Sequence, residues 1–344
     1  MFSVYQHWDP LKTCVVGRSY PPEFYSWIKN AKTRELFERI AIETEEDYLA
    51  IISKLQEFNV EVLRPGLPQK TLVDGRYIPP PMTPRDHMVM VGDRFIHTYD
   101  NNSINQDHDA PYRKIFEHVA QQGNRVEQSW FYAEDPALTQ FNGAMLSRIG
   151  KDLYIATYKD GGSVDPAVQN FVDGFFPDTR NHIVNTGGHG DGCYCPVAPG
   201  LIISIHDVPT YEKTFPDWEV VYIENQSWEK VQPFLDLKNQ NHGKWWIPGY
   251  EKDQGVINTV ETWLRDWVGY VEETVFDVNM LVIDPKNVMV FNYNEKVFEA
   301  LNRYNITPHV VPFRHRYFWD GGIHCITLDL DREGKMHNYF PNRQ

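Results

Sequence analysis

Cysteine is scarce in this chain of 344 residues, in which only Cys14, Cys193, Cys195 and Cys325 occur. So few cysteines in so long a chain do not make a disulfide scaffold, and a reducing compartment is the simplest expectation. Long apolar runs are also missing, since none reaches the roughly 18 residues that a membrane helix needs. The first residues lack the basic segment and following apolar segment of a signal peptide. We therefore expect a cytoplasmic protein without a membrane segment, whose thiols matter as chemistry rather than as cross-links.

Positive charge is in deficit as well. Lys and Arg number 33 against 47 Asp and Glu, which gives a formal net charge of −14. This balance is unfavourable for a nucleic-acid surface, and we expect no nucleic-acid partner. A negative field suits a cationic small substrate, although it also serves solubility alone. Hydrophobic residues make up 42% of the chain, which excludes general disorder, and the length allows two ordinary domains or one large one.

The sequence does contain a degenerate internal rhythm. Five segments share apolar, β-branched arms around Gly, Asp, Asn or Pro, and each is interpreted as a short β-hairpin. These segments are Thr13–Gly17 with its flanks, Met88–Ile96, Leu146–Ile155, Pro196–Ile203 and Met280–Phe291.

Helical stretches lie between the hairpins. Glu45–Phe58 carries Leu49, Ile52 and Leu55 at helical spacing, and Glu295–Tyr304 shows the same pattern. Strand-like runs follow at 60–63 and 309–312, so the recurring unit is strand, strand, helix, strand. Units too small to bury their own faces favour a ring or array that closes on one axis. An ordinary mixed α/β sheet remains open, because spacing alone does not exclude it.

One segment breaks this rhythm. Residues 224 to about 270 are rich in tryptophan, and Val256–Tyr270 has the pattern of an amphipathic helix. We interpret the segment as an insertion, which serves either as a lid or as an extra packing layer. Its tryptophans are Trp228, Trp245, Trp246, Trp263 and Trp267.

The sharpest local feature is Gly321-Gly-Ile-His-Cys-Ile-Thr327. Two glycines permit a tight turn, and the apolar run that follows would hold the thiol of Cys325 at the mouth of a strand. A nucleophilic cysteine needs a partly exposed site and a partner that favours the thiolate. The alternative is a cysteine that is simply buried in a strand.

A second feature is the glycine-rich run Gly187–Cys195. If the run is extended, His189, Asp191, Cys193 and Cys195 share one face. These residues fit either a metal site or a general acid/base histidine with a substrate-holding carboxylate. They also fit a loop without a function. The spacing departs from the usual zinc pattern, so we expect no metal.

A third feature is Pro84-Arg-Asp-His87, which stands just before the second hairpin. Asp86 is either a carboxylate of the site or the cap of a turn, and taken alone the turn is the more ordinary role.

Taken together, these segments resemble the amidinotransferase family, which includes the glycine and inosamine-phosphate amidinotransferases of the pentein superfamily. The resemblance extends over about residues 5–334, apart from the tryptophan-rich segment. It implies an α/β-propeller of five ββαβ modules around a pseudo-fivefold axis, with a central active-site channel. It also implies one domain over residues 1–344. The motifs that carry it are Thr83–Gly92, Phe141–Ala144, His189–Asp191 with Pro199–Ile203, and Gly321–Cys325.

The resemblance also implies an activity, the transfer of an amidino group from a guanidino donor to a primary amine through a covalent cysteine intermediate. Carried over, Cys325 is the nucleophile and His189 the acid/base, while Asp86 and Asp191 clamp the guanidinium. Two carboxylates can hold the planar N–H fork and aim its carbon at the sulfur. They should also raise the thiol pKa in the empty site, which suggests that substrate binding assists ionisation of Cys325.

Three positions depart from the family pattern. Asn142 stands where the family has an aspartate that orients the histidine, so we expect a less basic His189. Val208 stands where an arginine holds the donor's α-carboxylate, and Glu273 replaces a serine that assists it. These changes favour a donor with a cationic tail, such as agmatine. Alternatively Arg314 or Arg316 replaces the missing arginine, and L-arginine is the donor.

Two other functions remain open at this point. One is a guanidine-modifying hydrolase of the same superfamily, a deiminase or dihydrolase in which water attacks the intermediate. The other is a non-catalytic guanidine-binding protein. For each function we expect small-molecule partners, no cofactor and no membrane, with a homodimer as one possible assembly.

Overall fold

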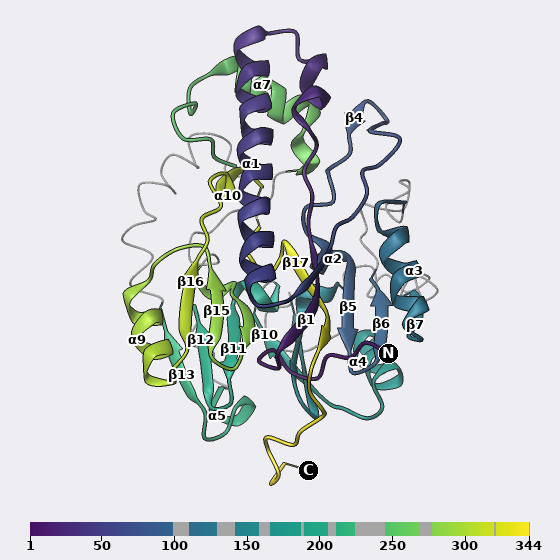
Figure 1. Ribbon diagram of the computed structural model, residues 1–344, viewed down its shortest axis with the longest axis vertical. Coiled ribbons are helices and arrows are strands. Elements are labelled where there is room, and N and C mark those ends of the chain that lie inside the picture. The colour runs from purple at the N-terminus through teal and green to yellow at the C-terminus, as the bar shows by residue number, and fades with distance from the viewer. Residues whose placement is uncertain are drawn as a thin grey trace.

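The computed structural model describes most of the chain (Figure 1). The described residues are 1–98, 110–128, 142–157, 166–186, 189–205, 211–223, 245–267, 277–319 and 321–343. Within them, no helix combines the length and the apolar character that crossing a membrane would need.

In the part of the chain that the structure describes, strands and helices mix in an α/β fold with five three-stranded sheets of one shared topology. In each sheet the middle strand pairs antiparallel with one neighbour and parallel with the other. Four sheets are built from consecutive strands. They are β5(Met88–Val91)–β6(Arg94–His97)–β7(Arg125–Gln128), β8(Leu146–Ile149)–β9(Asp152–Thr157)–β10(Arg180–Asn185), β11(Tyr194–Ala198)–β12(Leu201–Ser204)–β13(Glu219–Tyr222) and β14(Leu281–Asp284)–β15(Asn287–Val290)–β16(Thr307–Val310).

These four sheets contain the four later hairpins that the sequence predicts, and those predictions are confirmed. The first predicted hairpin is wrong. Residues Leu11–Val16 form a single strand, β1, which pairs antiparallel with β17 (Thr327–Arg332) and parallel with β2 (Glu61–Leu63). Pro21 and Pro22 follow β1 closely, and proline cannot supply the N–H donors that a returning arm would need. The partner therefore comes from the far end of the chain.

The helices lie at the outer edges of the sheets and above them (Figure 1). The main helices are α1 (Ala31–Glu57), α3 (Arg113–Gln121), α4 (Pro166–Phe175), α7 (Gln254–Trp263) and α9 (Glu295–Arg303). Shorter turns are α2 (Pro84–His87), α5 (Tyr211–Thr214), α10 (Arg316–Trp319), η1 (Pro22–Trp27), η3 (Ala110–Tyr112), η6 (Gly143–Met145), η7 (Gly190–Gly192) and η8 (Arg265–Trp267). A small hairpin, β3 (Leu72–Val73) with β4 (Arg76–Tyr77), completes the described elements.

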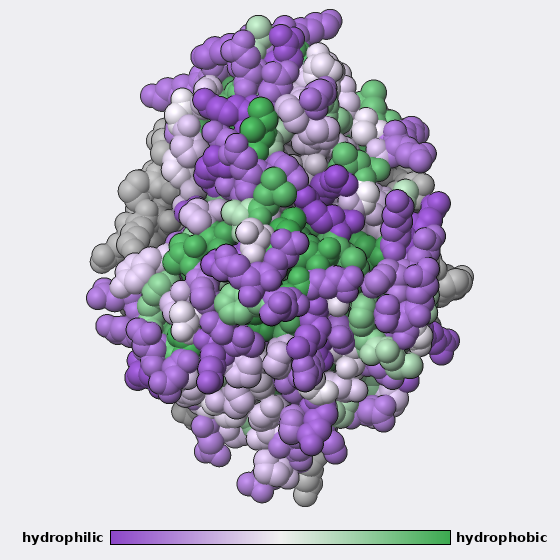
Figure 2. Space-filling view, in the orientation of Figure 1, coloured by the Kyte–Doolittle hydropathy of each residue, from purple (hydrophilic) through white to green (hydrophobic). Residues whose placement is uncertain are grey.

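The helix predicted at Glu45–Phe58 is the second half of α1. The helix begins earlier, where the side chain of Asn30 caps it by accepting from the Thr33 N–H at 3.1 Å. Leu49, one of the residues at helical spacing, is 54% exposed, whereas Leu55 is fully buried. Figure 2, which has the orientation of Figure 1, shows apolar side chains gathered across the middle of the visible face of the molecule.

The described part of the tryptophan-rich segment packs as a layer beside the upper end of α1 (Figure 1). Trp245 and Trp267 are buried in the same hydrophobic cluster as α1, and Trp267 donates its indole N–H to the Tyr77 carbonyl at 2.7 Å. The predicted helix over 256–270 is shorter, because α7 ends at Trp263. Residues 224–244, with Trp228, lie outside the described residues.

Candidate active site

The site is built from short turns that share one position in the topology. Each turn comes directly before the first strand of a sheet, namely before β5, β8, β11, β14 and β17. The turns α2 and η7 both contact η6, and α2 also contacts β17. The side chains that these five turns contribute are Asp86, then Asn142, then His189 with Asp191, then Asn279, and finally His324 with Cys325.

Cys325 lies at the base of the site and is 8% exposed. Its sulfur is 3.6 Å from Oδ2 of Asp191 and accepts a hydrogen bond from Nδ2 of Asn279 at 3.1 Å. Burial, followed by the charges of Asp191 and Asp86, raises the pKa of the Cys325 thiol well above its ordinary value. The empty site therefore favours the neutral thiol.

Asp191 is held by the histidine that precedes the cysteine. Nδ1 of His324 lies 2.8 Å from Oδ2 of Asp191. Burial lowers the pKa of His324 to about 4, so its imidazole is neutral and donates this hydrogen bond. Burial alone would raise the pKa of Asp191, but the bond from His324 contributes to a net pKa below the ordinary value. Asp191 is therefore an ionised carboxylate in a buried position.

Asp86 and His189 face each other on the other side. Nδ1 of His189 is 3.8 Å from Oδ1 of Asp86, and Nε2 of His189 is 2.9 Å from the Asn142 amide nitrogen. The structure thus places Asn142 where the resemblance implies a partner for His189. Burial raises the pKa of Asp86, against the opposing charge of His189. Gly143, which follows Asn142, lets its backbone lie close to the Met88 carbonyl oxygen, because a Cβ at this position would be 2.3 Å from that oxygen.

One oxygen on each carboxylate has no hydrogen-bond partner among the described residues. These atoms are Oδ1 of Asp86 and Oδ1 of Asp191, and both are buried. A buried carboxylate oxygen without a donor is costly, so such atoms are usually satisfied by a ligand, an ion or water. The pair therefore suits a cation that carries several N–H donors.

Behind the site lies a buried cluster of charges centred on Asp329 in β17. Its carboxylate accepts from Arg85 at 2.9 Å, from Arg148 at 2.8 Å and from Arg332 at 2.7 Å. Arg85 also donates to the His324 carbonyl at 2.8 Å, which ties the turn of Asp86 to the turn of Cys325. Three cations share one anion here, and the charge of Arg85 helps to lower the pKa of Asp191.

One expectation from the sequence is wrong, and others concern residues that the structure does not describe. The run from His189 to Cys195 is not extended, because residues 190–192 form η7, so its side chains do not share one face as proposed. Cys193 instead donates to the Thr186 carbonyl at 3.3 Å, and Cys195 is buried in β11. Val208 and Glu273 lie outside the described residues. Among the described residues, no group of three or more His, Cys, Asp or Glu side chains is placed to hold a metal ion.

Arg314 is already engaged elsewhere. Its guanidinium lies 2.8 Å from Oδ1 of Asp47 and 2.7 Å from Oε2 of Glu46, both on α1. Arg314 is therefore a poor anchor for a donor carboxylate. Arg316 donates to the Phe313 carbonyl and to the Tyr317 hydroxyl.

Sequence reasoning missed Asn279 and gave no role to His324. The position of Asn279 was a signal, because it comes just before the hairpin of β14 and β15, as Asp86 comes just before the hairpin of β5 and β6. The hydrogen bonds of both residues cross between sheets, and such contacts do not follow from local spacing.

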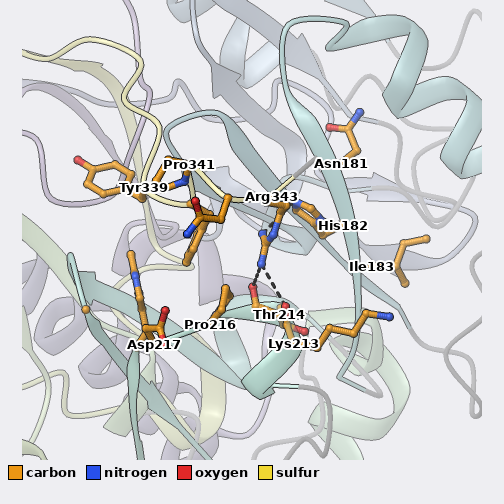
Figure 3. Close-up of a pocket in the computed structure, with 14 residues that line it drawn as sticks. Asn181, His182, Ile183, Lys213, Thr214, Pro216, Asp217, Tyr339, Pro341 and Arg343 are labelled. Carbon is orange, nitrogen blue, oxygen red and sulfur yellow. Dashed lines mark hydrogen bonds between the residues drawn. The ribbon is translucent and has the colours of Figure 1, made fainter.

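A separate cavity of about 880 Å³ lies between β10, the turn after α5 and residues 339–343 (Figure 3). Lys213, Trp218 and Arg343 line it, and none of the site residues above does. Arg343 points across this region and donates to the Thr214 carbonyl at 2.6 Å.

Comparisons with known proteins relate the chain to amidinotransferases. No family model matches the chain. The mitochondrial glycine amidinotransferase of Xenopus tropicalis is 25% identical over 168 residues, which are 48% of this chain and 32% of that protein. This alignment thus spans about a third of that relative. A putative inosamine-phosphate amidinotransferase 2 of Streptomyces griseus is 21% identical over 98% of this chain and 99% of its own.

Solved structures show the same fold. The inosamine-phosphate amidinotransferase StrB1 of Streptomyces griseus has a TM-score of 0.70 at 19% identity, over 98% of this chain and 99% of its own. SxtG, an amidinotransferase from Microseira wollei, has a TM-score of 0.69 at 18% identity with the same coverage. A dimethylarginine dimethylaminohydrolase has a TM-score of 0.56 at 12% identity, over 92% of this chain and 99% of its own. In sequence and in fold, the chain is therefore a relative of the amidinotransferases, a family of transferases.

Proposed function

We propose that this protein moves an amidino group from a guanidino donor to a primary amine through a covalent intermediate on Cys325. The observation that carries the proposal is the pair of buried carboxylates, Asp86 and Asp191, each of which has one oxygen without a partner among the described residues. The other oxygen of Asp191 lies 3.6 Å from the Cys325 sulfur. A guanidinium carries five N–H donors in a plane and a carbon at its centre. Two such oxygens can hold that plane and present its carbon to the sulfur.

Binding of the cation would ionise the nucleophile. Asp191 and Asp86 raise the thiol pKa in the empty site, and a bound guanidinium offsets their charge. The thiol proton then passes to the imidazole of His189. The fully formed thiolate exists only when there is a substrate to attack, which protects the sulfur from other electrophiles.

The reaction follows in two steps. The sulfur of Cys325 attacks the guanidino carbon, a C–S bond forms, and the C–N bond to the leaving amine breaks as His189 returns the proton to that nitrogen. In the second step the acceptor amine loses a proton to His189 and attacks the same carbon. The C–S bond breaks, and its electron pair returns to the sulfur. No electrons are gained or lost overall, and no cofactor is needed.

The shared topology of the five sheets supports, as part of this proposal, a propeller of five modules in a single domain with a central channel. Five turns at equivalent positions would then meet at the axis, which is where the site residues gather. The donor is L-arginine or an agmatine-like compound. Engagement of Arg314 by α1 favours the agmatine-like tail.

Mass spectrometry of donor and acceptor panels tests the proposal. L-arginine and agmatine, each labelled at the guanidino carbon, are mixed with amino-acid and diamine acceptors. Transfer predicts a labelled guanidino product, the free amine of the donor, and an amidino adduct on Cys325 that is absent from Cys325→Ser. The proposal fails if no acceptor becomes labelled.

Hydrolysis is the second candidate, because dimethylarginine dimethylaminohydrolase and an arginine dihydrolase share the fold. In that case the C–N bond that breaks in the first step releases ammonia instead of the donor's amine, and water replaces the acceptor amine in the second step. The same experiment would then show a ureido product and ammonia whether or not an amine is added.

A further inference from the structure

We propose that Asn279 is a catalytic residue, whose side-chain amide donates a hydrogen bond to the sulfur of Cys325 and stabilises it as a thiolate. This inference rests on the proposed function for its role in turnover. The contact itself belongs to the thiol and exists whichever electrophile that thiol attacks.

The orientation of the Asn279 amide is fixed by the backbone. Its Oδ1 accepts from the His324 N–H at 2.7 Å and from the Cys325 N–H at 3.1 Å. Two N–H donors require an oxygen at this position, so the amide nitrogen faces the other way. That nitrogen lies 3.1 Å from the Cys325 sulfur and 3.0 Å from the Asp191 carbonyl oxygen. Both of its hydrogens are thus directed at acceptors.

The glycines of the nucleophile turn make room for this amide. A Cβ on Gly322 would lie 2.2 Å from Oδ1 of Asn279, far inside contact distance. The turn at 321–325 therefore packs directly on the Asn279 side chain, which is 1% exposed. The glycine motif and Asn279 form one unit, although they precede strands of different sheets.

The chemistry explains why an amide suits this position. Asp191 and Asp86 oppose a negative charge on the sulfur, and burial adds to their effect. A cationic partner would stabilise the thiolate, but it would also repel a guanidinium from the same small site. An uncharged donor stabilises sulfur without this conflict. The other charged or titratable groups close to this turn are His324, His189, Arg85 and Asp329.

The same contact serves both steps. In the first step it stabilises the thiolate that attacks. In the second step the electron pair of the breaking C–S bond returns to sulfur, and the amide is already in place to receive that charge.

The test compares Asn279→Asp and Asn279→Ala with the whole wild-type protein. The rate of Cys325 alkylation by iodoacetamide is followed against pH by peptide mass spectrometry. Asn279→Asp removes the donor and adds a like charge, so its alkylation midpoint should rise by about one pH unit or more. The alkylation midpoint of Asn279→Ala should rise less. Turnover should fall about tenfold or more in both, as expected for a lost hydrogen bond to a charged group.

Asn124→Asp is the matched control. Asn124 is a buried amide that bonds only backbone atoms, at Phe2 and Asp93, and its replacement should leave the alkylation profile unchanged. A measurement on the unsubstituted protein avoids any loss of folding. The side-chain amide signal of Asn279 in nitrogen-15 NMR should titrate with the alkylation midpoint of Cys325.

The outcomes separate the two proposals. Folded Asn279 variants with the wild-type alkylation profile, or an Asn279 signal that does not move with Cys325, would overturn the role of Asn279. An altered alkylation profile in a protein that transfers no amidino group would uphold the thiol contact and reject the proposed function.

Discussion

Position 142 shows how much chemistry one side-chain atom controls. Asn142 and aspartate have nearly the same shape, but only aspartate adds a charge beside the imidazole of His189. The amide nitrogen of Asn142 lies 2.9 Å from Nε2 of His189. A neutral partner can orient this ring, but it stabilises the imidazolium less than a carboxylate would.

We expect Asn142→Asp to move the pH–rate profile. The added carboxylate favours the protonated imidazole, so the limb that reports His189 should shift to higher pH. Steady-state rates between pH 5 and 10 measure this, with Asn124→Asp as a control. An unmoved profile would mean that Asn142 is not the partner of His189.

His324 offers a second residue-scale prediction. Replacement by Asn keeps an N–H donor near the position of Nδ1, whereas replacement by Ala removes the 2.8 Å bond to Asp191. His324→Ala should weaken binding of guanidino compounds about tenfold or more, because one half of the clamp loses its hydrogen bond. His324→Asn should recover most of that loss. Equal affinities of both variants and the wild type, measured by calorimetry, would contradict this role.

The pKa of His324 also predicts how the folding stability of the protein changes at acidic pH. Its pKa falls from 6.5 to about 4 on folding, because burial disfavours the charged ring. The stability linked to this neutral ring is fully present above pH 6.5 and is lost as the pH falls toward 4. Urea unfolding at pH 7 and at pH 5 should show this loss in the wild type, and less of it in His324→Asn. His7 is also buried with a lowered pKa and contributes in the same direction.

At the scale of single elements, β17 depends on Asp329. Burial raises the pKa of this carboxyl, but Arg148, Arg332 and Arg85 bring the net pKa well below the ordinary value of 3.8. Its contribution is therefore present at neutral pH and is lost as the pH falls below about 4. Asp329→Asn leaves three buried cations without their anion and should cost about 3–5 kcal/mol of unfolding free energy. Chemical denaturation measures this, and a loss below about 1 kcal/mol would contradict it.

The elements also show what a sequence can predict. Four hairpins have both arms and their turn within one short segment, so local patterning finds them. The pairing of β1 with β17 joins distant segments, and no local pattern encodes it. Helix α1 begins earlier than predicted, although Leu36, Phe37 and Ile40 continue its buried stripe.

The site follows the same logic. Recognisable motifs contain four of the site residues, namely Cys325, His189, Asp86 and Asp191. The structure brings the turns that carry them together. The position of Asn279 before a hairpin was a weak signal, and its role did not follow from that position because its partners, Asp191, His324 and Cys325, lie far away in the sequence. Its importance emerges only from distances.

At the scale of the whole molecule, residues 338–343 connect the sheet of β8–β10 to the end of α5. Arg343 donates to Asp152 at 3.0 Å and to the Thr214 carbonyl at 2.6 Å, while Arg180 donates to Asp152 at 2.6 Å. We expect Arg343→Ala to lower the thermal midpoint by several degrees, since a partly buried charged contact is worth about 1.5–3 kcal/mol. Lys213→Ala is the control, and an equal effect of both variants would contradict a specific role for Arg343.

The pairing of β1 with β17 has a consequence for biosynthesis. When β1 leaves the ribosome, only β2 is soon available beside it, and its other edge waits until residues 327–332 have been translated. The thiol of Cys325 precedes those residues by two positions, so it acquires its surroundings in the same final event. Fragments from either half should be inert when expressed alone, whereas two co-expressed fragments that reconstitute this sheet should regain reactivity together.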